Sequence, residues 1–180
     1  MYPVLDTPRL RLRPLADADV PPLFALFNDS EAMRYWARPA MTDVAEVEAL
    51  LREIRSHSER ATLFQWGIAR REDDRVIGTC TLFRINQEHR RAEIGYIVRR
   101  DLWGQGLATE ALTALLNHAF GTMRLHRLEA DIDPRNAASI RLVERLGFVR
   151  EGRLRERFFV ADEIQDSLIY GLLAPDWWAR

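Results

Sequence analysis

Two glycines one residue apart, Gly104 and Gly106, stand between an apolar segment that ends at Val98 and a strongly patterned helical segment. Because glycine has no Cβ, the backbone can turn tightly here and an anion can approach it closely. The first four N–H groups of a helix have no partner within the helix, and the helix dipole makes that end positive. A glycine loop that leads into a helix is therefore suited to hold a phosphate or a diphosphate. The alternative is a tight strand-to-helix connection that binds no ligand.

The loop differs from two widespread nucleotide-binding motifs. A P-loop ends in Gly-Lys-Ser/Thr, and no lysine follows either glycine of this loop. The dinucleotide fingerprint has a third glycine where this chain has Thr109, and it lies near the head of a βαβ unit rather than past mid-chain. We therefore expect a ligand other than a nucleoside triphosphate or NAD.

Apolar periodicity predicts the elements that must position this loop. After the glycines, apolar residues recur every four positions from Leu107 to Phe120, which predicts one broad buried helix face. Alternating or continuous apolar segments bounded by turn residues predict the strands. We expect strands over 10–13, 64–69, 76–85, 93–98, 128–132, 148–160 and 167–173, and helices over 17–27, 42–58, 107–120 and 137–146.

Hairpins join most of these strands, and one helical crossover lies between the fourth and the fifth. The sequence therefore predicts an α/β fold with a mixed, mostly antiparallel sheet of about seven strands and helices on both faces. The 180 residues are 47% hydrophobic, which is enough for one substantial core, so we expect a single domain over residues 1–180.

Composition narrows the classes of function. The net charge of −1 gives no electrostatic reason to expect nucleic-acid or membrane binding. No apolar run reaches the roughly 18–20 residues that span a bilayer, and no secretory signal is expected. The single cysteine, Cys80, is incompatible with an internal disulfide and fits a reducing cytoplasm, where we expect the protein. The four histidines are not clustered, so we expect no metal site.

Two later motifs extend the glycine loop into a family pattern. Residues 136–139 read Asn-x-x-Ser, and residues 146–148 read Leu-Gly-Phe. Together with the loop at 103–108, these motifs resemble the acetyl-coenzyme A site of the GNAT superfamily of N-acetyltransferases. In detail the chain is similar to the RimJ/RimL-like branch, the ribosomal-protein alanine or serine N-terminal acetyltransferases. The similarity covers nearly the whole chain and includes 7–13, 92–96, 151–152, Asp166, 170–173 and 176–177.

The resemblance implies a GNAT fold, acetyl-coenzyme A as the co-substrate without a metal, and a primary amine as the acceptor. Two residues depart from the family pattern. Trp103 stands where the loop motif has Gln or Arg, a change that binding through backbone amides should tolerate. Val143 stands where many members have a tyrosine that protonates the leaving thiolate. Ser139 is therefore the expected acid, as in the branch that the chain resembles.

We expect the diphosphate of the coenzyme at the amides of 105–108, and its pantetheine arm beside the strand that ends at 96–98, as an added strand. Asn136 is a natural helix N-cap, and the family motif also implies that it contacts the coenzyme. Arg141 and Arg145 would meet the 3′-phosphate or the adenine, or be ordinary surface charges. The expected coenzyme-binding residues are Tyr96, Ile97, Val98, Trp103, Gly104, Gln105, Gly106, Leu107, Ala108, Thr109, Asn136, Ser139 and Arg145.

Glu93 lies on the strand expected to flank the thioester, and it is the expected catalytic base, acting through a water. An α-amino group with a pKa of about 7.7–8.0 is roughly a tenth neutral at pH 7, whereas a lysine with a pKa of about 10.4 is only ~0.04% neutral. An α-amine therefore needs the weaker base. The alternative for Glu93 is a solvated residue or an ion pair with Arg90 or Arg91, and Glu72 and Glu156 are weaker candidates for the base.

The sequence thus predicts an acetyl-coenzyme A-dependent N-acetyltransferase that acts on a primary amine, with a protein or peptide N-terminus as one acceptor. The alternatives are a small amine, such as a polyamine, an antibiotic or another toxic amine, and a non-catalytic coenzyme-binding regulator of a partner. Acidic residues are interspersed with basic ones, so no strongly acidic surface for lysine-rich tails is expected. We expect the acceptor groove to come from 28–41 and 153–165, and a homodimer is among the assemblies that the sequence allows.

Overall fold

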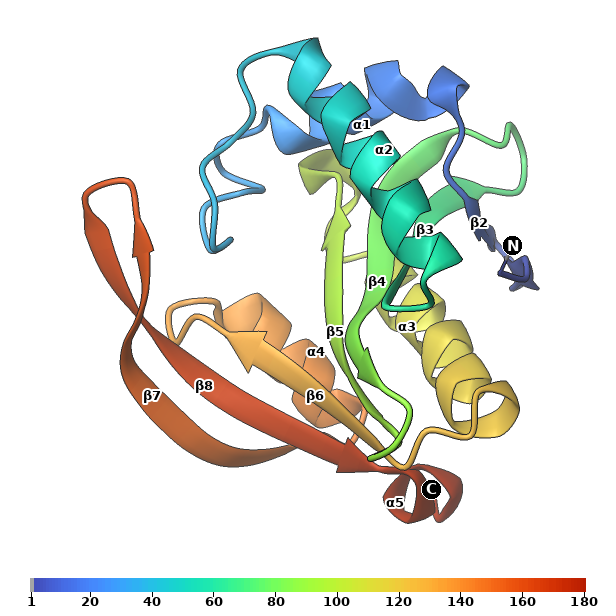
Figure 1. Ribbon diagram of the computed structural model, residues 1–180, viewed down its shortest axis with the longest axis vertical. Helices are drawn as coiled ribbons and strands as arrows, with labels where there is room; N and C mark the ends of the chain where they lie inside the picture. Colours follow the sequence, from blue (N-terminus) through green and yellow to red (C-terminus); the bar gives the residue numbers. More distant parts are fainter. Residues whose placement is uncertain (1) are drawn as a thin grey trace.

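Eight strands form one sheet in the order β1-β2-β3-β4-β5-β6-β8-β7 (Figure 1). The structure is a computed structural model that describes residues 2–180. Every neighbouring pair is antiparallel except β5 with β6, so the predicted mixed, mostly antiparallel sheet is confirmed. The strands are β1 (Leu5–Asp6), β2 (Leu10–Pro14), β3 (Leu63–Arg70), β4 (Val76–Asn86), β5 (Arg91–Val98), β6 (Arg127–Ile132), β7 (Val149–Val160) and β8 (Glu163–Leu173). The strand beyond the expected seven is β1, whose two residues are too few to form a pattern.

The helices agree with the predicted ones except at their ends. Asp43 and Glu46 form a capping box, so α2 begins just after the residue that the sequence indicated. The long helix after the glycines changes from an α-helix to a π-helical turn, η3, before it ends. No helix within residues 2–180 is long and apolar enough to cross a membrane. The helical elements are η1 (Asp17–Asp19), α1 (Val20–Phe27), α2 (Val44–Glu59), η2 (Arg100–Leu102), α3 (Leu107–Asn117), η3 (His118–Thr122), α4 (Ala137–Arg145) and α5 (Ala174–Trp178).

Helices cover both faces of the sheet, as predicted. On one face, α1 and α2 bury Leu23 and Leu51 in a cluster that includes Ile97 of β5. On the other face, α3 and α4 bury Leu112 and Val143 against the remaining strands. Burying a side chain such as Leu112 in this way contributes about 1.5–3 kcal/mol to folding. The sheet is therefore the rigid wall between two packed layers.

The β5 and β6 strands form a wedge, and this is the feature of the sheet that matters most for function. They pair in parallel only from Arg91 to Glu93, opposite Arg127 to Glu129. Beyond this point β6 turns away from β5 (Figure 1). The rest of β5 remains paired with β4 alone, so its other edge faces the opening. Unpaired backbone N–H and C=O groups at such an edge are available to a ligand.

The β7–β8 hairpin extends well beyond the body of the sheet (Figure 1). Its register shifts between Leu154 and Phe158, where three residues of β7 face Asp166 alone on β8. Glu156, at the centre of this bulge, has a positive φ of 53°. Bulges re-aim the side chains near them, and they are common beside active sites. The bulge thus changes which side chains of β7 point toward the rest of the protein.

Candidate active site

The glycine loop has the backbone of an anion-binding loop. Gly104 and Gly106 both have φ of 76°, a conformation that L-residues rarely adopt. Gly106 is the N-cap of α3, and no side chain of residues 2–180 caps that helix end. The free amides of the first turn therefore point out of the helix with no competing partner, which fits the diphosphate of a coenzyme.

The N-terminal segment of the chain holds this loop in place. Arg9 donates from Nη1 to the carbonyl oxygen of Gln105 at 3.0 Å, and from Nε to Glu110 on α3 at 2.6 Å. Thr7 donates to the same carboxylate at 2.6 Å. Partial burial alone would raise the pKa of Glu110, but the hydrogen bonds from Thr7 and Arg9 outweigh it and lower that pKa. Glu110 is therefore an ionised anchor for the first turn of α3.

Trp103, at the start of the glycine loop, has an indole that connects two elements of the site. The ring nitrogen donates a 2.7 Å hydrogen bond to the carbonyl oxygen of Val98, the last residue of β5. The side chain remains 50% exposed. Trp103 thus joins the end of β5 to the start of the loop, and the Val98 carbonyl is no longer free for a ligand.

A cavity of about 610 Å³ lies along the wedge, the loop and the first turns of α3 and α4. Arg141 and Arg145 line it, and no ion pair within residues 2–180 involves either of them. Gln105 does not line it, and its carbonyl accepts a hydrogen bond from Arg9. The predicted coenzyme residues that do line this cavity are Tyr96, Ile97, Val98, Trp103, Gly104, Gly106, Leu107, Ala108, Thr109, Asn136, Ser139 and Arg145.

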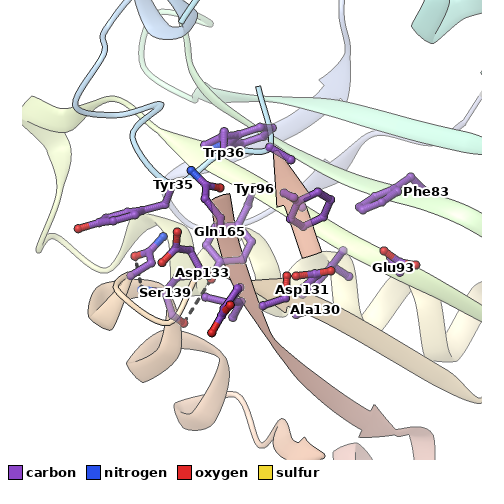
Figure 2. A pocket seen from close by; sticks show the side chains of 18 of the residues that line it. Tyr35, Trp36, Phe83, Glu93, Tyr96, Ala130, Asp131, Asp133, Ser139 and Gln165 are labelled. Atoms are coloured by element: carbon purple, nitrogen blue, oxygen red, sulfur yellow. Dashed lines mark hydrogen bonds between the residues drawn. The ribbon is translucent and has the colours of Figure 1, made fainter. Parts of the chain in front are cut away.

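A second, smaller cavity of about 290 Å³ opens on the other side of the wedge (Figure 2). Its walls come from β5, β6, the loop after α1 and the β7–β8 hairpin, so both segments predicted for the acceptor groove contribute to it. Tyr96, Asn136 and Ser139 line both cavities, together with Tyr35 and Trp36. The two cavities therefore meet at the free edge of β5 and the N-terminus of α4.

At this junction two hydroxyl groups form a short hydrogen bond. The Tyr96 hydroxyl lies 2.5 Å from Oγ of Ser139, and the Ser139 amide donates to Oδ1 of Asn136 at 3.1 Å. Burial raises the pKa of Tyr96 to about 12, and the hydrogen bond with Ser139 offsets part of that rise. Val143, on the same helix, is fully buried and carries no proton to give. The pair of hydroxyls therefore offers side-chain protons at the point where the free edge of β5 meets the first turn of α4.

Glu93 lies at the other end of the smaller cavity from Ser139 (Figure 2). The alternative for Glu93 was an ion pair with Arg90 or Arg91, and the structure shows an ion pair with a different arginine. Instead Arg84 donates from Nη1 to both carboxylate oxygens, at 3.0 and 3.1 Å. The reason is a bulge in β4, where Arg84 has a positive φ of 50° and follows Phe83, the residue opposite Glu93.

The two weaker candidates for the base lie elsewhere. Glu72 pairs with Arg70 at an exposed turn, and Glu156 lies in the exposed β7 bulge. Neither residue lines either cavity. Glu93 is thus the one sequence-predicted base that lines the smaller cavity.

Sequence analysis missed two side chains of the site. Tyr96 was expected to act through its backbone, whereas its hydroxyl lies at the junction. Asp131 was not considered, although strand alternation places it on the face of β6 opposite the buried Ala130 and Ile132. Folding also gathers carboxylates that are dispersed along the chain, because Glu93, Asp131, Asp133 and Asp166 all line the smaller cavity.

Known proteins resemble this chain in sequence and in fold. A sequence model of the family described as "Acetyltransferase (GNAT) domain" matches residues 9–149. The uncharacterized N-acetyltransferase YoaA of Bacillus subtilis is 32% identical over 175 residues, which are 97% of this chain and 99% of that protein.

Two solved structures from Vibrio cholerae have the same fold over nearly their whole length. Spermidine N-acetyltransferase, in complex with CoA and spermine, has a TM-score of 0.84 at 27% identity, over 96% of this chain and 99% of that one. A candidate ribosomal-protein-serine acetyltransferase has a TM-score of 0.82 at 26% identity, over 96% of this chain and 99% of that one. The similar proteins thus include enzymes named for quite different amine acceptors.

Proposed function

This chain belongs to the acetyltransferase (GNAT) family, and from that premise we propose that its acceptor is the α-amine of a peptide or protein N-terminus. Family membership makes the chain an acetyl-coenzyme A-dependent N-acetyltransferase. The acceptor is the finer question, because the similar proteins act on different amines.

The larger cavity fits the coenzyme on the evidence of its own residues. Acetyl-coenzyme A, when bound, supplies an acetyl group on a thioester. The uncapped amides of Leu107 and Ala108 would hold its diphosphate, with Arg141 and Arg145 providing positive charge along the same wall. The unpaired edge of β5 would accept the peptide-like arm as an added strand.

Glu93 is the residue proposed to accept the proton of the acceptor, through a water. A carboxylate at the cavity that lies opposite the coenzyme is placed for this task. Arg84 already donates to both of its oxygens, so a water that passes a proton to Glu93 must share a carboxylate that is engaged. Such a base suits an α-amine, which is roughly a tenth neutral at pH 7, better than a lysine. This engaged carboxylate is the observation that carries the proposal of an α-amine.

Ser139 and Tyr96 are the proposed proton donors on the other side of the junction. Tyr96 keeps its proton at any physiological pH, because burial raises its pKa to about 12. The serine hydroxyl can turn toward the coenzyme while the tyrosine hydroxyl donates to it. A thiolate is already a good leaving group, so a hydrogen bond to it is enough and full protonation is not required.

A polyamine is the second candidate, because four carboxylates line the smaller cavity and a polyamine carries several positive charges. The test compares the rates at which the protein acetylates three acceptors at equal concentration. These are a peptide with a free N-terminal Ala, the same peptide blocked at its N-terminus with an internal Lys, and spermidine. The proposal expects the free N-terminus to react fastest. Fastest reaction of the lysine peptide or of spermidine would contradict it and leave the enzyme class unchanged.

A further inference from the structure

Asp131 is the carboxylate of the smaller cavity that lacks a close partner. Its side chain is 16% exposed, and its one ion pair within residues 2–180 is with Arg157, at 3.7 Å from Nε to Oδ2. That distance is too long for a hydrogen bond. Asp131 is partly exposed, so its oxygens are open to solvent and can accept hydrogen bonds from a ligand that enters the cavity.

The other three carboxylates of this cavity are fully engaged. Asp133 accepts from Arg135 at 2.6 Å, and Asp166 accepts from Nε of Arg153 at 2.8 Å. Glu93 accepts from Arg84 with both oxygens. A cation that enters the cavity would therefore have to break a close ion pair at each of these residues, but not at Asp131.

The position of Asp131 in the wedge also distinguishes it from Glu93. Glu93 faces Glu129 in the last paired position of β5 and β6, at the closed end of the wedge. Asp131 lies two residues further along β6, where the strands have separated. In Figure 2 it lies between Ser139 and Glu93. It therefore flanks the opening through which the acceptor and the coenzyme must meet.

Arg157 reaches this place only because of the β7 bulge. The bulge spans the three residues that precede Phe158, and Arg157 is the last of them. Its guanidinium is 5.7 Å from the centre of the Phe158 ring, and its side chain remains 39% exposed. A half-exposed cation that is near Asp131 but not bound to it can be displaced at little cost, because exposed ion pairs stabilise weakly.

We propose that Asp131 binds the ammonium group of the acceptor, and that Arg157 is an internal counterion that the acceptor displaces. The inference rests on the proposed function, because it names the residue that receives the amine before Glu93 accepts its proton. Asp131 determines affinity for cationic acceptors, whereas Glu93 determines the rate. The two carboxylates therefore divide binding and proton transfer between them.

The test measures binding without turnover, by calorimetry on the protein saturated with coenzyme A rather than acetyl-coenzyme A. The probes are alanyl-alaninamide, its neutral analogue lactyl-alaninamide, and spermidine. A hydrogen bond to a charged group typically contributes more than one between neutral groups. Asp131→Asn should therefore weaken binding of at least one cationic probe by about tenfold or more. The same variant should leave the weak binding of the neutral analogue unchanged. Arg157→Gln should tighten binding of the cationic probe by up to about fivefold, the limit for an exposed ion pair.

Two variants serve as controls in this experiment. Arg155→Gln removes a neighbouring bulge arginine that makes no ion pair within residues 2–180, and it should change no affinity. Glu93→Gln should reduce turnover but not probe affinity. Thermal unfolding of Asp131→Asn checks that the fold is intact.

Equal probe affinity in Asp131→Asn and in the unmodified protein would overturn the proposal. So would weaker binding in Arg157→Gln, or no binding of either cationic probe to the unmodified protein. The proposed acceptor fails separately, if the peptide α-amine is not acetylated in the turnover assay while the pattern of binding is as expected.

Discussion

The hydroxyl of Tyr96 and Oγ of Ser139 lie 2.5 Å apart, and this contact joins the free edge of β5 to the first turn of α4. Both residues line both cavities, so the contact lies where the coenzyme and the acceptor would meet. Val143, at the position where the family resemblance suggested a tyrosine, is buried and has no proton to give. The phenol at α4 comes instead from Tyr96 on β5, and it reaches the first turn of the helix.

If the two hydroxyls act in series, Tyr96→Phe and Ser139→Ala should each lower kcat by about 10²-fold, the lower end of the range for general acids. The lower end is expected because a thiolate is already a good leaving group. The double variant should lose little more than either single one, since both remove the same proton path. Steady-state kinetics with coenzyme affinity measured in parallel tests this. Losses that multiply in the double variant would contradict a relay.

The pH dependence of Glu93→Gln tests the base. At pH 7 the variant should be about tenfold slower, because without the carboxylate only the neutral amine reacts, and that is roughly a tenth of an α-amine at this pH. As the pH rises to 9.5 the free amine replaces the base, so the ratio of the two rates should approach one. Arg84→Gln is the matched control, and it should keep or raise activity because it frees the Glu93 oxygens. A constant ratio from pH 7 to 9.5 would rule out this role for Glu93.

Gly106 is the residue at which the loop can best be blocked. Valine there must adopt a φ of 76°, which β-branched residues avoid, and its side chain would extend over the amides at the start of α3. We expect Gly106→Val to abolish coenzyme binding in calorimetry while the protein remains folded. Gly152→Val is the control, because its Cβ meets nothing within 4 Å and φ is ordinary. Unchanged coenzyme affinity in folded Gly106→Val would mean that the loop does not bind the diphosphate.

Because Glu110 anchors the first turn of α3 as an ionised carboxylate, its contribution to the free energy of unfolding should depend on pH. Its pKa in the folded protein is lowered, so its contribution is fully present above the unfolded carboxyl pKa of about 4.3 and is lost as the pH falls below it. Glu110→Gln should therefore reduce the free energy of unfolding by about 1–2 kcal/mol at pH 7. At pH 3 the difference from the unmodified protein should nearly vanish. A loss of the same size at both pH values would show that the charge of Glu110 contributes nothing.

Local patterns in the sequence were sufficient for the fold and for the coenzyme loop. The four-residue apolar steps after Gly106 predict α3, and Gly147, with a φ of 90°, ends α4 as such a residue should. The family, the enzyme class and the coenzyme that the motifs implied are confirmed. The helices and the motifs each depend on a few neighbouring residues, so a short stretch of sequence is enough to predict them.

The acceptor side of the site depends on contacts between residues that are far apart in the sequence, so no short stretch of sequence predicts it. The wedge exists because the pairing of β5 with β6 stops after Glu93, and this follows from packing of the whole sheet. The pairing of Glu93 with Arg84 depends on a bulge at a non-glycine residue, and so does the approach of Arg157 to Asp131. A positive φ at arginine or glutamate is set by tertiary contacts rather than by propensity.

The proposed preference of this enzyme for an α-amine can be tested on a single peptide. The peptide carries a free N-terminal Ala and an internal Lys, so both amines compete for the same enzyme at the same concentration. After limited reaction with acetyl-coenzyme A, tandem mass spectrometry locates the acetyl group. We predict that it is found on the N-terminal amine at early times. An acetyl group found first on the lysine side chain would contradict this preference.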